Sequence, residues 1–353
     1  MNSKRIDCIE GLRTIGWIGV FLCHFRGAFF PNATIWMDST PLRFIYSGNA
    51  YVRLLFVISG FVISYKYFLK DKYDDALQDI CKRYFRLMPP ILAAELFVFV
   101  LMNVGALRNA EVATMIGSEN FLGIFNQFTP NIGTCLKEAL FSTYFNGANA
   151  YIGPLWTMIY EYLGAIFVIA AVSILKKSNW RWIFYGVFLY ANSNYYNYFV
   201  IGMLICDLYA NFDIPLKIKE RKLSIIIALV GYTMLSMVNL NDSDKYSRIV
   251  FGIGIILFML GVLSSDFLNK ILGNKLMVKG GELAYSAYII HWPIVETISC
   301  GLLLLFYDEV NYKLLVSIIC IISFIFIVIF AYLMKKYVEP LGLYISRNLK
   351  LMK

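Results

Sequence analysis

Long apolar runs, separated by short connections that carry most of the charge, set the pattern of this sequence. Residues 223–238, 249–263 and 314–334 are examples. Runs close to or above about 18 residues with few charges are typical of membrane-spanning helices, because lipid offers no partners for exposed backbone groups. The pattern therefore predicts an all-α integral membrane protein, a polytopic bundle of about ten transmembrane helices.

The predicted spans share an apolar interior and have polar, glycine or proline residues near their ends. They cover residues 14–30, 48–66, 89–107, 153–175, 180–192, 196–211, 223–240, 248–265, 284–306 and 312–334. The segment 180–192 is short for a hydrocarbon layer of about 30 Å, so we expect it to be tilted, broken or half-buried in protein. The sequence predicts one transmembrane domain over residues 1–353, with no fused soluble domain.

Composition supports the membrane class, and charge sets the orientation. Hydrophobic residues make up 59% of the chain, charged residues 16%, and the mean hydropathy is +0.64. With a cytoplasmic N-terminus, three quarters of the 32 Lys and Arg residues fall in cytoplasmic segments. The positive-inside rule then predicts that both termini are cytoplasmic. This topology explains the net charge of +9, and no basic tail or stripe points to nucleic acid.

Cysteine and histidine usage limits the chemistry that we expect. None of the seven cysteines forms a CxxC pair, and the only histidines are His24 and His291. A zinc site needs about four clustered ligands, and the sequence has no Cys/His cluster. We predict free thiols, no bound metal and no bound cofactor.

Two ionisable residues share one face of the first span. Arg13 and His24 are 11 residues apart, which is about 20° past three helical turns and about 16 Å along the axis. Ionisable groups inside a membrane are costly and usually face the bundle interior. Imidazole is the side chain best suited to take a hydroxyl proton near neutral pH. The alternative is that His24 bonds a neighbouring helix as packing support.

Three further segments carry polar groups into or beside apolar runs. Ser59 precedes Gly60, a pair that lets helix backbones approach closely. Arg83 and Arg86 would share a helix face and suit a phosphate-bearing ligand, although a cytoplasmic anchor explains them equally well. Glu161 lies in the fourth span, where it would orient a histidine, hold an acceptor or form a structural pair.

The last two motifs lie near the C-terminal end of the chain. Pro293 follows His291 closely and would kink the ninth span beside it, exposing backbone groups that often line a pocket. His291 taken alone is better explained as a structural residue. Glu339 and Pro340 follow the last span and suggest a helix stop.

Taken together, these segments resemble the membrane-bound acyltransferase family 3, the group that contains O-antigen, Nod-factor and exopolysaccharide O-acyltransferases. The likeness runs over nearly the whole chain and rests on six motifs in the family's order. They are Arg13 and His24 with ten residues between, Leu55–Phe61 for Phe-Phe-x-x-Ser-Gly-Phe, Arg83 with Arg86, Leu155–Glu161 for Leu-Trp-Ser-Leu-x-x-Glu, Tyr285–Pro293 for Ser-Tyr-x-x-Tyr-x-x-His-x-Pro, and Glu339 with Pro340. Three positions depart from the family's motifs. Leu55 stands where the first Phe is usual, Tyr162 where a second Glu is often found, and Glu10 where Asp is usual.

The resemblance implies an O-acetyltransferase of the plasma (inner) membrane. Its implied donor is cytoplasmic acetyl-CoA or another acyl-CoA, and its implied acceptor is a sugar hydroxyl on a lipid-linked or surface glycan such as an O-antigen, capsule or exopolysaccharide unit. By this likeness His24 is the leading catalytic residue. Our mechanistic hypothesis is that His24 acts as the general base and that Glu161 helps to hold its imidazole. The implied roles of the other residues are acyl-donor binding for Arg13, Arg83 and Arg86, and pocket or structural support for Ser59, Trp156, Tyr288 and His291.

The competing class is transport. A ten-span bundle with intramembrane Arg, His and Glu would also suit a glycan exporter or a proton-coupled carrier. The sequence shows no inverted repeat and no matching pair of spans broken by Gly or Pro. A silent sensor that binds acyl-CoA is a third option. Formation of an ester on the glycan separates the first class from the others.

Overall fold

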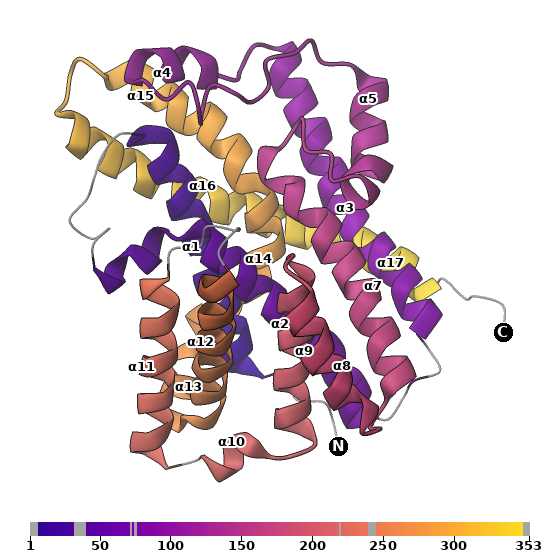
Figure 1. Cartoon of the computed structure of the whole chain (residues 1–353). Coiled ribbons are helices and arrows are strands. Elements are labelled where there is room, and N and C mark those ends of the chain that lie inside the picture. Colours follow the sequence, from indigo (N-terminus) through magenta and orange to yellow (C-terminus); the bar gives the residue numbers. More distant parts are fainter. Residues whose placement is uncertain are drawn as a thin grey trace. The chain divides into compact units, whose positions relative to one another are not determined.

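A computed structural model describes residues 6–31, 40–70, 73, 76–218, 220–238 and 245–348. Every element in these ranges is a helix, and no strand occurs in them (Figure 1). In chain order the helices are α1 (Asp7–Phe29), η2 (Pro41–Tyr46), α2 (Gly48–Lys70), α3 (Ala76–Asn103), α4 (Asn109–Ile116), α5 (Ile132–Lys137), η3 (Glu138–Ser142), α6 (Thr143–Phe145), η4 (Gly153–Thr157), α7 (Met158–Leu175), α8 (Trp180–Ala191), α9 (Tyr196–Ala210), α10 (Ile214–Lys217), α11 (Arg221–Met237), α12 (Lys245–Ser264), α13 (Asp266–Leu272), α14 (Lys275–Ile294), η5 (Val295–Ser299), α15 (Cys300–Phe306), α16 (Tyr312–Tyr337) and α17 (Glu339–Asn348).

The predicted class, a polytopic helical membrane protein, is confirmed. Within the described ranges, seven helical stretches are long and apolar enough to cross a membrane: Asp7–Phe29, Gly48–Leu69, Ala76–Asn103, Gly153–Leu175, Lys245–Ser264, Lys275–Phe306 and Tyr312–Asn348. The other three predicted spans also coincide with helices, but α8, α9 and α11 have only 12, 15 and 17 residues. Positions 239 and 240 of the predicted span 223–240 lie outside the described residues. The count of ten and the cytoplasmic termini stay predictions.

The chain divides into two compact units, which we describe separately. The first comprises Met1–Gly19, Ile35–Ile80 and Tyr160–Glu282, and the second comprises Val20–Thr34, Cys81–Ile159 and Leu283–Lys353. Helix α1 passes from the first unit into the second, so Arg13 belongs to one and His24 to the other. The single domain expected from the sequence stays a prediction.

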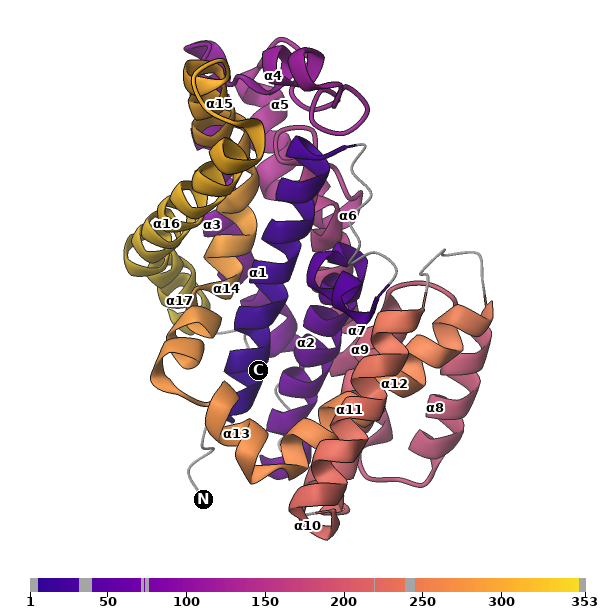
Figure 2. The same cartoon turned by 90° about the vertical axis from the view of Figure 1, so that its left-hand side faces the viewer.

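Close helix packing in the first unit depends on small residues. A Cβ atom on Gly60 of α2 would lie 2.1 Å from the carbonyl oxygen of Phe199 in α9, and one on Gly202 would lie equally close to Val57 O. Helices α11 and α12 run side by side (Figure 2) and meet at Gly231 and Gly261 in the same way. Without side chains at these positions the backbones come into contact, and small residues of this kind are enriched where helices pack in lipid. The close approach predicted at Ser59-Gly60 is confirmed.

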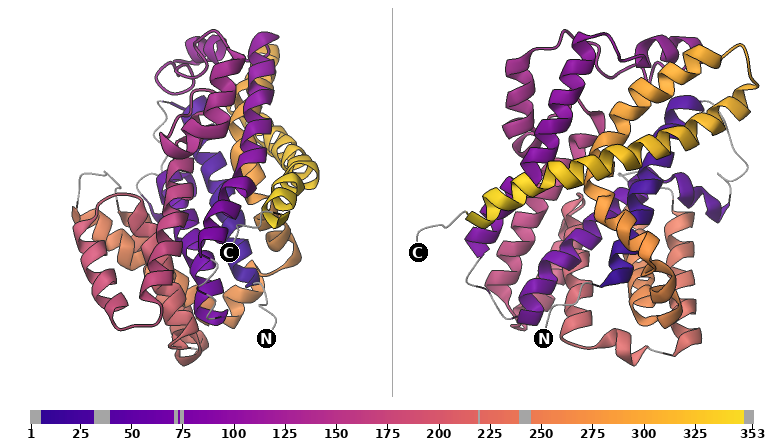
Figure 3. Two further views of the ribbon diagram at one scale, coloured as in Figure 1. Left: turned by 90° about the vertical axis from the view of Figure 1, so that its right-hand side faces the viewer. Right: turned by 180° about the vertical axis from the view of Figure 1, so that it is seen from behind.

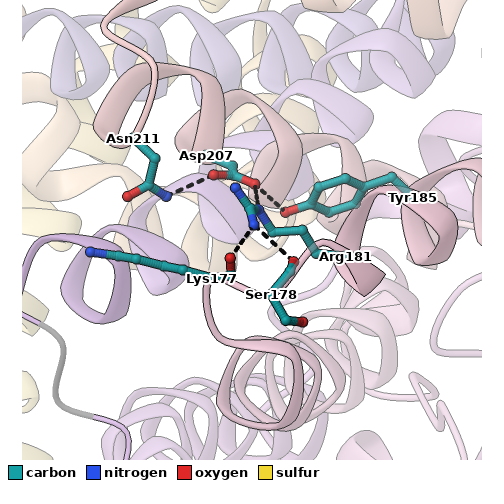
Figure 4. A network of polar contacts seen from close by, with 6 residues as sticks. All are labelled: Lys177, Ser178, Arg181, Tyr185, Asp207 and Asn211. Carbon is teal, nitrogen blue, oxygen red and sulfur yellow. Dashed lines mark hydrogen bonds and ion pairs between the residues drawn. The ribbon is translucent and has the colours of Figure 1, made fainter.

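A buried ion pair fastens α8 to α9 in the first unit (Figure 4). Arg181 Nε donates to Asp207 Oδ2 over 2.6 Å, and the two side chains are 6% and 0% exposed. Tyr185 OH donates to the same carboxylate oxygen, and Asn211 Nδ2 donates to the other. Arg181 also donates to the carbonyls of Lys177 and Ser178 just after α7. The short segment 180–192 is therefore held by polar contacts at one end.

Helix α3, which enters the second unit at Cys81, begins earlier than the sequence suggested. The predicted span started at Pro89, but α3 starts at Ala76 and carries Pro89 and Pro90 inside it. A proline cannot donate to the carbonyl four residues earlier, so the carbonyls of Phe85 and Arg86 lose their helical partners.

The last helix of the chain covers these two carbonyls. Gly342 of α17 packs on them, because a Cβ there would lie 2.7 Å from Phe85 O. Helices α16 and α17 together form one long rod (Figure 3). The helix stop predicted at Glu339 is therefore confirmed only in part, because one helix ends there and another begins. Helix α16 ends at Tyr337, and Glu339 and Pro340 open α17, where proline is tolerated in the first turn.

The segment between α3 and η4 contains four short helices held by buried polar groups. Asn131 caps α5 by accepting from the backbone N–H groups of Gly133 and Thr134. Glu138 is only 8% exposed, and its Oε1 accepts from Tyr151 N over 3.1 Å. Burial raises the pKa of Glu138 above its ordinary value, and backbone N–H donors offset part of that rise.

This carboxyl should make stability depend on pH. Because the pKa is raised in the folded state, Glu138 favours folding below its ordinary pKa and loses that contribution as pH rises through the raised one. Glu138→Gln keeps an oxygen acceptor and cannot ionise. We expect its unfolding midpoint in detergent to exceed that of the unchanged protein at pH 8 and to approach it at pH 4. Glu111→Gln, at an exposed site, is the control. A wild-type advantage that grows with pH would contradict the expectation.

Candidate active site

Two histidines that are far apart in the sequence meet in the second unit. His24 Nδ1 and His291 Nε2 are 2.8 Å apart. The ring planes differ by 3° and the ring centroids are 5.0 Å apart. Because the nitrogen–nitrogen distance is much shorter than the centroid distance, the two parallel rings meet edge to edge. This in-plane contact is the geometry of an imidazole–imidazole hydrogen bond.

The second nitrogen of His291 fixes the direction of this hydrogen bond. His291 Nδ1 lies 2.6 Å from the carbonyl oxygen of Tyr288. A carbonyl only accepts, so Nδ1 carries the proton, and in a neutral His291 Nε2 is then an acceptor. His24 must donate to it from Nδ1. In a neutral pair, His24 therefore has its lone pair on Nε2.

The hydroxyl of Tyr288, three residues before His291, anchors helix α14. Tyr288 OH donates to Pro154 O over 3.0 Å and lies 2.9 Å from Thr157 Oγ1. Both partners belong to η4, which also holds the half-buried Trp156. Tyr288 thus supports His291 twice, through its carbonyl and through its hydroxyl. Its predicted supporting position is compatible with these contacts.

Aromatic side chains surround His24. The Trp292 ring approaches it edge-on with centroids 5.5 Å apart, and the Phe121 ring lies at 6.3 Å. Phe125 in turn packs on Trp292 at 4.9 Å. His291 is 1% exposed, whereas His24 is half-buried. Such a setting restricts water and strengthens the polar contacts inside it.

A buried carboxylate lies five residues beyond His291, and the sequence reasoning missed it. Glu296 is 0% exposed and its Oε1 accepts from Asn126 Nδ2 over 2.9 Å. The backbone carbonyl of the same residue accepts from Arg108 N. A glutamate inside an apolar run is itself a signal of a functional or paired residue. That signal was present in the sequence beside His291.

The expected kink at Pro293 takes another form. Helix α14 continues through Pro293 to Ile294 and then changes to the π-helical turn η5, Val295–Ser299. Thr297 Oγ1 donates to Pro293 O over 2.6 Å. A π-helical turn adds a residue to the helix and is frequent at functional sites. The register of side chains therefore shifts after His291, and the π-helical turn contains Glu296.

The two arginines of α3 lie in the same unit as the histidine pair. Arg83 is half-buried and Arg86 is exposed. The chain just after them is held by Tyr285 OH, which donates to Leu87 O over 2.6 Å. Ser286, the next residue of α14, donates to Glu339 Oε1 over 2.7 Å. Helix α14 thus carries both His291, the predicted supporting residue, and the contacts to the arginine segment.

The remaining candidates belong to the first unit. Arg13 Nη1 pairs with Glu10 Oε1 over 3.0 Å within α1. Ser59 Oγ donates to Glu161 Oε1 over 2.8 Å and so joins α2 to α7. The carboxylate that was expected to hold an imidazole thus has a serine partner. A contact between Glu161 and His24 would join the two units and stays a prediction.

Comparison with known proteins identifies the family. The family model described as "Acyltransferase domain", of the acyltransferase 3 type, matches residues 6–334. The chain belongs to acyltransferase family 3. No curated protein and no solved structure gives a significant match.

As a member of acyltransferase family 3, the chain is a membrane acyltransferase. In its neutral state the His24–His291 pair has a fixed tautomer, and such an imidazole suits proton removal from a hydroxyl. In the described part of the chain, no group of three or more His, Cys, Asp or Glu side chains could hold a metal ion. The assignment of individual site residues stays a prediction.

Proposed function

We propose that this acyltransferase moves an acetyl group from cytoplasmic acetyl-CoA to a sugar hydroxyl of a cell-surface glycan. The glycan would be an O-antigen, capsule or exopolysaccharide unit, and the membrane would be the plasma (inner) membrane. Family membership supports acyl transfer in general. The identities of the acyl donor, the acceptor and the general base go beyond family membership and are our proposal.

One observation carries the proposal: the hydrogen-bond chain from His24 through His291 to the Tyr288 carbonyl. In the neutral state this chain leaves the lone pair of His24 on Nε2. A base with a fixed tautomer, oriented by a second residue, is a recurring arrangement in enzymes that activate a hydroxyl. His24 is therefore the proposed general base, and His291 is the residue that orients it.

The proposed reaction forms one bond and breaks one bond at the acetyl carbonyl carbon. The sugar oxygen attacks this carbon as His24 Nε2 takes the hydroxyl proton. The carbon–sulfur bond of the thioester then breaks, and the proton leaves with the sulfur as the CoA thiol. The products are an O-acetyl sugar and free CoA, with no oxidant or reductant required. A base in this role contributes roughly 10²- to 10⁴-fold to the rate.

The proposed donor side uses arginines. Arg83 and Arg86 lie three residues apart on α3, near the cytoplasmic end that the charge pattern assigns. Guanidinium groups bind phosphate oxygens bidentately, and CoA carries several phosphates. Arg13, paired with Glu10, is the third proposed donor residue.

The test uses cells with the unchanged chain, with His24→Ala and with no chain. Their surface polysaccharide is compared by proton NMR after growth with ¹³C-labelled acetate. We expect a labelled O-acetyl signal only with the unchanged chain. Loss of surface glycan without any change in ester content would favour an exporter. An ester that persists without the chain would contradict the proposal.

A further inference from the structure

A small cavity lies at the end of α1 that follows His24. Its volume is about 260 Å³, and its walls include Arg26, Gly27, Phe30, Ser118, Asn120 and Phe121. All of these residues belong to the second unit, as the histidine pair does. The charge pattern assigns this end of α1 to the outer side of the membrane.

The cavity is linked to His24 by one helical turn. Gly27 is three residues after His24, so the two positions share a face of α1. Gly27 has no side chain, and a Cβ there would lie 2.7 Å from Phe121 Cζ. The Phe121 ring lines the cavity and also packs near the imidazole of His24. The Phe121 ring thus lies beside both the cavity and the imidazole of His24.

Hydrogen bonds within the protein hold the wall formed by residues 117–123. The carbonyl oxygen of Ser118 accepts from the backbone N–H groups of Phe121, Leu122 and Gly123 at 3.1, 2.8 and 3.2 Å. Asn109, which is 2% exposed, donates to Leu122 O and Phe125 O from its side chain. A preformed wall reduces the ordering cost of binding.

A second aromatic residue of the cavity wall, Phe30, is also held in place. Phe30 packs edge-on against Tyr312, with ring centroids 5.9 Å apart. Tyr312 OH donates to the carbonyl of Phe29 over 2.5 Å. The aromatic ring of Phe30 therefore has a supported position at the end of α1, and two phenylalanine rings bound the same cavity.

The chemistry of these walls suits one sugar ring. A pyranose has apolar C–H faces, which pack on aromatic rings, and hydroxyls at its edge. Asn120 offers both an amide donor and an acceptor, and Arg26 offers several N–H donors. The volume lies below the roughly 300–1,000 Å³ typical of sites for drug-sized ligands. A single ring fits such a space, and the rest of a glycan would extend outward.

We propose that this cavity is the acceptor subsite. It takes one sugar ring of the glycan between Phe30 and Phe121, holds the ring hydroxyls with Asn120 and Arg26, and directs one hydroxyl toward His24. This inference rests on the proposed function. It adds a location and a set of specificity residues that none of the six sequence motifs contains.

Acceptor kinetics test the subsite. The purified protein is given ¹⁴C-acetyl-CoA and surface polysaccharide from the same cells after alkaline removal of its esters. We expect Asn120→Ala and Arg26→Gln each to raise the half-saturating polysaccharide concentration by about tenfold. The half-saturating acetyl-CoA concentration should not change. Glu119→Ala, next to Asn120 and exposed, is the matched control and should behave like the unchanged chain.

The outcomes separate the two proposals. If the unchanged chain labels no polysaccharide, the proposed function fails, and the subsite fails with it. If the unchanged chain labels it and both variants keep its half-saturation value, only the subsite is overturned. Equal unfolding midpoints for all variants ensure that a change reflects binding.

A labelling experiment checks the location without turnover. Asn120→Cys and Glu119→Cys are exposed to a membrane-impermeant maleimide, with the parent chain as background. We expect the de-esterified polysaccharide to slow labelling of Asn120→Cys at least threefold and to leave Glu119→Cys unchanged. Equal rates with and without polysaccharide at Asn120→Cys would overturn the subsite.

Discussion

Replacing His24 by glutamine should lower the rate of acetyl transfer to the glycan by about 10²- to 10⁴-fold. Glutamine keeps a polar side chain of similar length and can still donate to His291, but it has no nitrogen basic enough to take a hydroxyl proton. The fold should survive, because the glutamine amide can replace the 2.8 Å hydrogen bond that His24 makes to His291. The measurement is release of CoA thiol by the purified protein in the presence of polysaccharide, together with the unfolding midpoint.

Variants of Cys23 and His291 test whether the loss of activity is specific to the imidazole of His24. Cys23→Ser changes the adjacent residue, which points about 100° away on the helix, and should keep nearly full activity. His291→Gln can still accept the proton of His24 Nδ1, whereas His291→Leu cannot. We expect the leucine variant to have the lower maximal rate at an unchanged half-saturating acetyl-CoA concentration. A His24→Gln protein that retains most of its activity would rule out His24 as the base.

Replacing Asp207 by alanine should destabilise the protein by about 3–5 kcal/mol, the largest stability effect we expect. Arg181 would keep its charge in a buried site without a carboxylate. Its remaining contacts would be the carbonyls of Lys177 and Ser178 and the rings of Trp182 and Phe212. The unfolding midpoint in detergent and the yield of folded protein are the measurements. Asn211→Ala removes only one donor to Asp207 and should cost about 1 kcal/mol.

A double replacement distinguishes charge from shape. Arg181→Met with Asp207→Leu removes both charges and keeps apolar volume, so it should recover most of the stability that Asp207→Ala loses. If the double variant is as unstable as the single one, the pair acts through packing or through its other hydrogen bonds. That result would contradict an explanation based on an unpaired buried charge.

Hydrophobic pattern alone was enough to place the long apolar helices, because lipid imposes the same demand on every span. It located even α8, whose 12 residues are few for a crossing. Helix starts were harder. The predicted third span began at Pro89, whereas α3 begins at Ala76. Gly342 and Tyr285 contact the carbonyls that precede the two prolines of this helix.

The sequence identified individual candidate residues of the site, but it did not show which of them lie together. His24 and His291 each stood out as ionisable groups in apolar runs, yet nothing in their spacing shows that they touch. Their contact joins residues 267 positions apart, and only tertiary packing sets such a distance. Glu296 was detectable by the same rule that marked Glu161. The cavity beside Gly27 was not, because it depends on the absence of one side chain and on the path of a loop.

The carbonyl of Tyr288, at the end of the hydrogen-bond chain from His24 through His291, limits where a proton can go during the reaction. Tyr288 O can accept a hydrogen bond but cannot take up a proton, so the chain is closed on that side. A proton removed from a sugar hydroxyl cannot be passed on through His291 and must leave from the atom that received it. In the proposed reaction, Nε2 of His24 therefore serves the incoming oxygen and the departing sulfur in turn. Both substrates then have to converge on a single nitrogen atom, whichever side of the membrane each one comes from.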